Sequence, residues 1–233
     1  MKHLLFSGKQ KLSDLIHANY KLLQVLPRFN IKLGFENKKV DEVCEQYGIS
    51  PHLFLMVCNV CTFDTYAPGK EAGQLDIDGL ILYLTRSHQD YREYRIPVIK
   101  EQLNRLLDRH NAREEESVRQ FFDDYSAEVI KHLRHEEHTV FPYIYGLKQG
   151  VRSEQYHIRQ FEKNHGNIEE KLHDLKNIII KYLPDQNDGE LRNQVLFNLF
   201  WLEEDLNRHT LLEERILVPF AQQLEERLNI NHE

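Results

Sequence analysis

A histidine followed four residues later by a glutamate occurs twice in this chain, and this spacing constrains how both segments fold. The first copy is His132 and Glu136, and the second is His209 and Glu213. Positions i and i+4 share one face of an α-helix, so a helix aims each imidazole and its carboxylate at one point. Both copies continue into an apolar run that ends in proline. Two such pairs facing each other would supply much of the ligand shell of a two-metal centre.

The composition is typical of a soluble globular protein. The 233 residues are 41% hydrophobic and 29% charged, which is enough for a core and suits a mostly helical chain. No apolar run approaches the roughly 20 residues of a membrane span, and the N-terminus does not resemble a secretory signal. Three cysteines fit a reducing interior, and a net charge of −7 argues against nucleic acid as the main partner. We therefore expect a cytoplasmic protein with no membrane or nucleic-acid partner.

The N-terminal part of the chain is predicted to be a small helical unit. Leucines recur at helical spacing over residues 12–26, and a second helix is predicted over residues 40–47, ended by Gly48. Ser50 as N-cap and Pro51 as the first helical residue predict the start of a third helix. These signals place a compact helical domain in residues 1–65.

Residues 66–76 contain a proline and two glycines and are predicted to be a linker to a second domain over residues 77–233. Four long amphipathic segments follow, separated by turns that contain glycine or proline. They predict an all-α fold, an up-down-up-down four-helix bundle preceded by the small helical domain. The alternative is an irregular helical array with a polar, metal-free core. The four segments run over about 78–109, 114–147, 153–182 and 190–228, and Pro97 is expected to kink the first.

Each of the four segments carries one histidine at a similar height in the predicted bundle. At about 1.5 Å of rise per residue, the distances from these histidines to the helix ends agree to within about one turn. The two glutamates of the repeated pattern are the expected bridges, because only a carboxylate can give one oxygen to each of two metals. The six predicted metal ligands are His88, His132, His165, His209, Glu136 and Glu213.

These segments resemble known di-iron proteins. Residues 132–142 and 209–219 are similar to the paired signatures of hemerythrin-like domains, and residues 87–91 and 164–166 are similar to the other two histidine positions of that family. Residues 25–51 resemble the small N-terminal domain of the RIC (repair of iron centres) family. The resemblance implies two non-haem iron ions with an oxo or hydroxo bridge. It further implies a stress-response protein that supplies labile iron to iron–sulfur proteins damaged by nitric oxide or oxidants.

Two departures from the family pattern leave alternatives open. An adjacent Cys-Cys pair, frequent in the small domain of RIC proteins, is missing from the corresponding residues 31–37. Glu169 stands where oxygen-carrying hemerythrins have a second histidine on the third helix, so it is a candidate for a third carboxylate ligand. A module that binds or senses dioxygen or nitric oxide, or one that reduces nitric oxide, therefore remains an alternative, and no enzymatic activity is assigned. The resemblance also allows a homodimer.

Several other groups are left outside the predicted site. His110 lies 22 residues after His88, about 33 Å along one helix, which is too far for both to reach one metal pair. Two Glu-x-x-His copies, at residues 162–165 and 170–173, lie on one helix, whereas ferritin-type sites draw them from two. Tyr91 is expected to be a packed core residue. His135, His138, His157 and His173 are expected to lie away from the ligands.

The cysteines allow two interpretations. Cys58 and Cys61 form a C-x-x-C pattern, and with Cys44 and His52 they could make a zinc site. They also lie in an apolar helical run, where cysteine behaves as a small hydrophobic residue. We favour the structural role.

Overall fold

The structure is a computed structural model that describes residues 5–68, 75–107, 113–151, 156–162, 168–183 and 189–230. Its regular elements are helical, with one isolated antiparallel bridge between Lys11 and Lys39 in the described part of the chain. The predicted all-α class is therefore confirmed. Two compact units are formed, the first by Met1–Ser87, Gly146–Arg152 and Arg208–Glu233, the second by His88–Tyr145 and Ser153–Asn207.

The N-terminal helices of the first unit agree with the local signals in part, because residues 12–26, predicted as one helical stretch, are divided at Asn19 into separate helices. The predicted helix over residues 40–47 is confirmed, and Gly48 ends it with a left-handed φ of 65°. The hydroxyl of Ser50 accepts the backbone N–H of Leu53 at 3.3 Å, and Pro51 occupies the first helical position. These helices are α1 (Leu12–Ala18), the 3₁₀ turn η1 (Tyr20–Gln24), α2 (Val25–Arg28), α3 (Val40–Tyr47) and α4 (Pro51–Val60).

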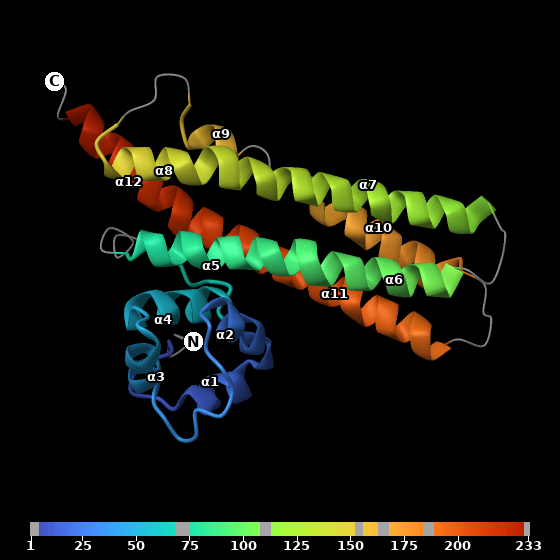
Figure 1. The fold of residues 1–233 in the computed structure, drawn as a ribbon, viewed down its shortest axis with the longest axis horizontal. Helices are drawn as coiled ribbons and strands as arrows, with labels where there is room; N and C mark the ends of the chain where they lie inside the picture. Colours follow the sequence, from blue (N-terminus) through green and yellow to red (C-terminus); the bar gives the residue numbers. More distant parts are fainter. Residues whose placement is uncertain are drawn as a thin grey trace. The chain divides into compact units, whose positions relative to one another are not determined.

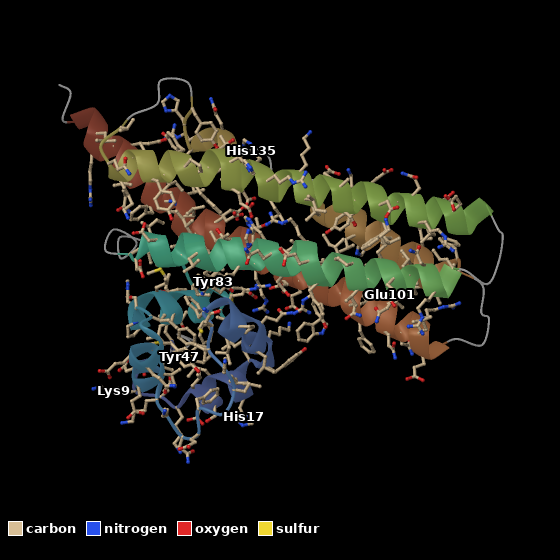
Figure 2. The ribbon with its side chains drawn as sticks, viewed as in Figure 1. Lys9, His17, Tyr47, Tyr83, Glu101 and His135 are labelled. Atoms are coloured by element: carbon tan, nitrogen blue, oxygen red, sulfur yellow. The ribbon has the colours of Figure 1, made fainter. Side chains whose placement is uncertain are left out.

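The N-terminal helices share a core with the first part of α5 (Ile77–Asp90). The rings of Phe29 and Tyr83 have centroids 4.9 Å apart, and the Arg86 guanidinium donates to the carbonyl of Arg28 at 3.0 Å. Figure 2 shows Tyr83 on the side of α5 that faces α2 and α4. Independent folding of residues 1–65 stays a prediction, because this unit also includes residues from α5 and the C-terminal part of the chain.

The second unit contains the predicted four-helix bundle. Successive long helices run in opposite directions (Figure 1), and α7 packs against both α6 and α10. Leucine, isoleucine, valine and aromatic side chains form one continuous core between the helices. The helices are α6 (Ile96–Leu107), α7 (Arg113–His135) with the following α8 (Phe141–Lys148), the short α9 (Arg159–Glu162), α10 (Ile168–Lys181) and α11 (Gly189–Leu212).

The third segment of the bundle begins later than predicted. Its first described helical residue is Arg159, whereas the expected start was residue 153. Tyr156 is not helical, and its ring packs edge-on against Tyr143 with centroids 4.9 Å apart. Tyr156 thus makes a tertiary contact outside a helix, and tertiary packing commonly overrides a weak helical preference.

The three cysteines lie in the core of the first unit as buried thiols. Burial raises the pKa of Cys44 from its ordinary value of 9.0 to about 12, with Asp41 adding to the effect. Burial also raises the pKa of Cys58 well above the same value, helped by Cys61 and Cys44 nearby. His52 is exposed, whereas the three cysteines are buried. These observations favour the structural role of the thiols over a zinc site.

We expect the three thiols to react with a reagent such as DTNB only after unfolding. The thiolate is the reactive form, and the folded core disfavours it. Since folding raises the pKa of Cys44 to about 12, the stability that its protonated thiol contributes is complete below about pH 9 and is lost as pH rises towards 12. Rapid labelling of the folded protein at pH 8 would contradict this.

Candidate metal centre

Glu136 is a fully buried carboxylate whose two oxygens contact two different histidines. Its Oε2 lies 2.9 Å from Nε2 of His88, and its Oε1 lies 2.7 Å from Nε2 of His132. His88 comes from α5 and His132 from α7, so the contact joins two helices. The structure thus brings together three of the predicted ligands within the second unit.

The far side of His88 contacts a pair of residues that the sequence analysis missed. Nδ1 of His88 lies 2.9 Å from Glu137, and the Arg92 guanidinium contacts both oxygens of Glu137 at 2.8 and 2.9 Å. The hydrogen bond from His88 and the nearby Arg92 lower the pKa of Glu137 to about 2. Arg92 lies four residues after His88, and Glu137 directly follows Glu136. Their spacing from predicted ligands was therefore a sequence signal that both lie near the site.

The contacts of His88 define a binding geometry for a cation. A neutral imidazole carries one N–H, so it can donate to only one of the two carboxylates beside it. When Nδ1 donates to Glu137, Nε2 presents a lone pair next to an oxygen of Glu136. A metal ion accepts both donors at once, and a carboxylate behind the ligand histidine is the usual support in metal sites. The residues present therefore fit a metal ion.

The second copy of the repeated pattern forms a similar pair in the first unit. Nε2 of His209 lies 3.3 Å from Oε1 of Glu213, and both side chains are buried. His209 belongs to α11, and Glu213 begins the π-helical turn that follows it. An imidazole beside a buried carboxylate is a donor pair of the kind that holds a transition-metal ion, so this pair is a second candidate pair of ligands.

Three π-helical turns accompany the candidate ligands. They are η3 (Tyr91–Arg95), η4 (Glu136–Val140) and η5 (Glu213–Leu217), each closed by a hydrogen bond from the next residue's N–H to the carbonyl of the first. η3 begins three residues after His88, and the other two begin at a candidate ligand. Such turns are rare and often mark functional sites.

Proline accounts for the positions of these turns. Pro97, Pro142 and Pro219 each lie six residues after the first residue of a π turn. A proline ring inside an α-helix clashes with the carbonyl four residues earlier, and a wider turn moves that carbonyl away. A widened turn thus precedes Pro97, and the kink expected there stays a prediction. The extra residue rotates the face of the following helix by about 100°, which separates the ligand face from the core face.

Aromatic rings pack beside the two histidines that contact Glu136. Phe141 stacks on His88 with centroids 5.7 Å apart, and Phe161 lies parallel to His132 at 6.3 Å. The His88 side chain is 0% exposed, whereas that of His132 is 16% exposed. The two imidazoles therefore differ in their access to solvent.

The remaining predictions have mixed outcomes. His165 and His110 lie outside the described residues, and Glu169 is in α10. Tyr91 is a packed core residue, as expected, and its hydroxyl donates to the carbonyl of Asp205 at 3.3 Å. His138, His157 and His173 are exposed, and His135 is half-buried.

Comparison with known proteins supports a metal-binding bundle. The sequence profile described as "Hemerythrin HHE cation binding domain" matches residues 95–221, which is more than half of the chain. The matched range contains both copies of the repeated pattern and two of the three π turns, and it begins after His88. A search of curated proteins finds no match.

We expect anaerobic addition of iron(II) to raise the melting temperature of the metal-free protein. At a ligand concentration about 100 times Kd, binding adds about 2.7 kcal/mol per site, or roughly 5–10 °C for a chain of this length. His132→Ala should lose part of this shift, because it removes the proposed metal ligand that contacts Oε1 of Glu136. Exposed His173→Gln is the control and should retain the shift; an equal loss in both variants would contradict the site.

Proposed function

The chain belongs to the hemerythrin HHE cation-binding family, and we propose that it binds two iron ions and supplies iron to damaged iron–sulfur proteins. Domains of this family bind metal ions, and the buried histidine and carboxylate donors suit iron. The resemblance of residues 25–51 to the small domain of RIC proteins favours iron supply under oxidative or nitrosative stress over oxygen carriage.

The observation that carries the proposal is the position of Glu136. Each of its oxygens contacts a different imidazole, His88 through Oε2 and His132 through Oε1. A carboxylate that divides its oxygens in this way is suited to bridge two metal ions. Within the described residues, we propose that the ligands of the two irons are His88, His132, Glu136, His209 and Glu213. His165 is retained as a further proposed ligand.

The side chains at this site compensate charge, orient a ligand histidine and pack against it. When bound, the two irons with an oxo or hydroxo bridge supply Lewis acidity and redox capacity. The carboxylates offset the positive charge inside a low-dielectric bundle, where an unpaired ion is costly. Glu137 is placed to accept a hydrogen bond from the Nδ1–H of His88, which leaves the lone pair of Nε2 for a metal ion. Phe141, stacked on the His88 ring, limits the access of water.

Iron is the cargo in this proposal, and its release is assigned to the histidine and carboxylate ligands. The alternative carriers within the chain are the cysteines, but all three are buried. Their burial raises the pKa of Cys44 to about 12 and that of Cys58 as well, so these two stay protonated. A protonated, inaccessible thiol is a poor metal ligand.

We expect the iron-loaded protein to restore the cluster of an apo iron–sulfur protein in the presence of sulfide and thiol. Glu136→Gln should reduce iron content and the rate of cluster recovery at least about tenfold, because an amide neither bridges two metals nor offsets their charge. The measurement is the recovery of cluster absorbance or of aconitase-type activity. His173→Gln, which changes an exposed histidine, is the matched control.

Three results would contradict the proposed function. Transfer that proceeds equally well with free iron(II) at the same concentration would remove any role of the protein. Tight, reversible binding of dioxygen or nitric oxide without loss of iron would instead favour a gas-binding or gas-sensing module. Catalytic consumption of nitric oxide by the loaded protein would favour a reductase.

A further inference from the structure

Arg92 is a cation beside a site proposed to bind cations. Its Nη1 donates to both oxygens of Glu137, at 2.8 and 2.9 Å, and Oε1 of Glu137 lies 2.9 Å from Nδ1 of His88. The Glu137 carboxylate thus lies between the guanidinium and an imidazole proposed to bind metal. On charge alone, a fixed positive group at this position weakens the binding of a metal ion. Arg92 therefore needs an explanation other than charge.

The contact between Arg92 and Glu137 joins two π turns. Arg92 belongs to η3 and lies four residues after His88. Glu137 belongs to η4 and directly follows Glu136. All four residues are in the second unit. The side chains of Arg92 and Glu137 are 23% and 19% exposed, so water screens their attraction only in part.

Arg92 restrains a side chain that would otherwise be flexible. Fixing a glutamate side chain costs up to about 2 kcal/mol of conformational entropy. The contacts of Arg92 to both carboxylate oxygens restrain the plane of the Glu137 carboxylate as well as its position. Oε1 of Glu137 is thereby kept as the acceptor for the Nδ1–H of His88, and Nε2 keeps its lone pair for a metal ion.

We propose that Arg92 is a positioning residue for metal binding, which acts through Glu137 to hold His88 in the tautomer and orientation in which Nε2 binds the ion. This inference rests on the metal centre of the proposed function and adds a cationic residue to it. The two explanations of Arg92 predict effects of opposite sign. Positioning predicts that removal of Arg92 weakens metal binding, whereas charge alone predicts that its removal strengthens binding.

The test is a zinc titration of the full-length, metal-free protein in competition with a chromophoric chelator. Zinc(II) accepts imidazole and carboxylate ligands and has no redox chemistry. Glu137→Gln should weaken zinc binding about 10- to 100-fold, the usual effect of losing a carboxylate behind a ligand histidine. Arg92→Gln should weaken it by about tenfold, the lower end of that range. Arg92→Lys should recover part of the loss, because an ammonium group also pairs with a carboxylate.

A double variant tests whether Arg92 acts through Glu137. Once Glu137 is replaced by glutamine, removal of Arg92 costs no further positioning and takes away a positive charge. Arg92→Gln combined with Glu137→Gln should therefore bind zinc at least as tightly as Glu137→Gln alone. Losses that simply add in the double variant would overturn the proposed link.

Arg95→Gln is the matched control. Arg95 lies in the same π turn and also pairs with a carboxylate, that of Asp90 at 3.1 Å. This substitution removes the same charge from η3 and should not weaken zinc binding. A second measurement is the proton NMR signal of the Nδ1–H of His88 in the zinc-saturated protein. It should lie downfield and exchange slowly with water in the wild type and in Arg95→Gln, and exchange faster in Arg92→Gln.

The outcomes separate this inference from the proposed function. Unchanged or tighter zinc binding in Arg92→Gln, or an equal loss in Arg95→Gln, would overturn the inference and leave the proposed function standing. A wild-type protein that binds neither zinc nor iron would overturn both. The predicted order of zinc affinities, without iron transfer to an apo iron–sulfur protein, would overturn the proposed function alone.

Discussion

A fully buried carboxylate, Glu136, contacts two imidazoles from two helices, and the rest of the second unit is arranged to make this possible. Burial of a charge without partners would cost several kcal/mol. Here the cost is offset by His88 and His132, and one further carboxylate with its arginine lies behind His88. The contacts are short, divided between the two oxygens, and away from bulk water, as a bridging ligand requires.

Each helix that carries candidate ligands also contains or adjoins a π turn. Each must present ligands over one stretch and apolar side chains over the next, and one uninterrupted helical face does not do both. The π turns η3, η4 and η5 lie at the transitions and precede Pro97, Pro142 and Pro219. Each proline, which would disrupt a regular helix, thus follows a π turn that rotates the side-chain positions of the helix after it.

Local signals in the sequence predicted much of this structure. The i, i+4 spacing placed His132 with Glu136, and His209 with Glu213, because helix geometry alone determines those pairs. The contact of His88 with Glu137 was missed, because it joins two helices, and the three π turns were missed as well. Hydrophobic periodicity cannot reveal such a turn, since one extra residue leaves the pattern on each side intact. Arg92 lies four residues after His88, which was a local signal, but its partner Glu137 lies 45 residues away in the sequence.

The most direct test of the two-iron centre is X-ray absorption at the iron edge, combined with the iron content of the purified chain. We predict about two irons per chain, nitrogen and oxygen neighbours, and a scattering path from one iron to the other that is lost in Glu136→Gln. One iron per chain without an iron–iron path, or a path that survives this substitution, would contradict a pair of irons bridged by Glu136.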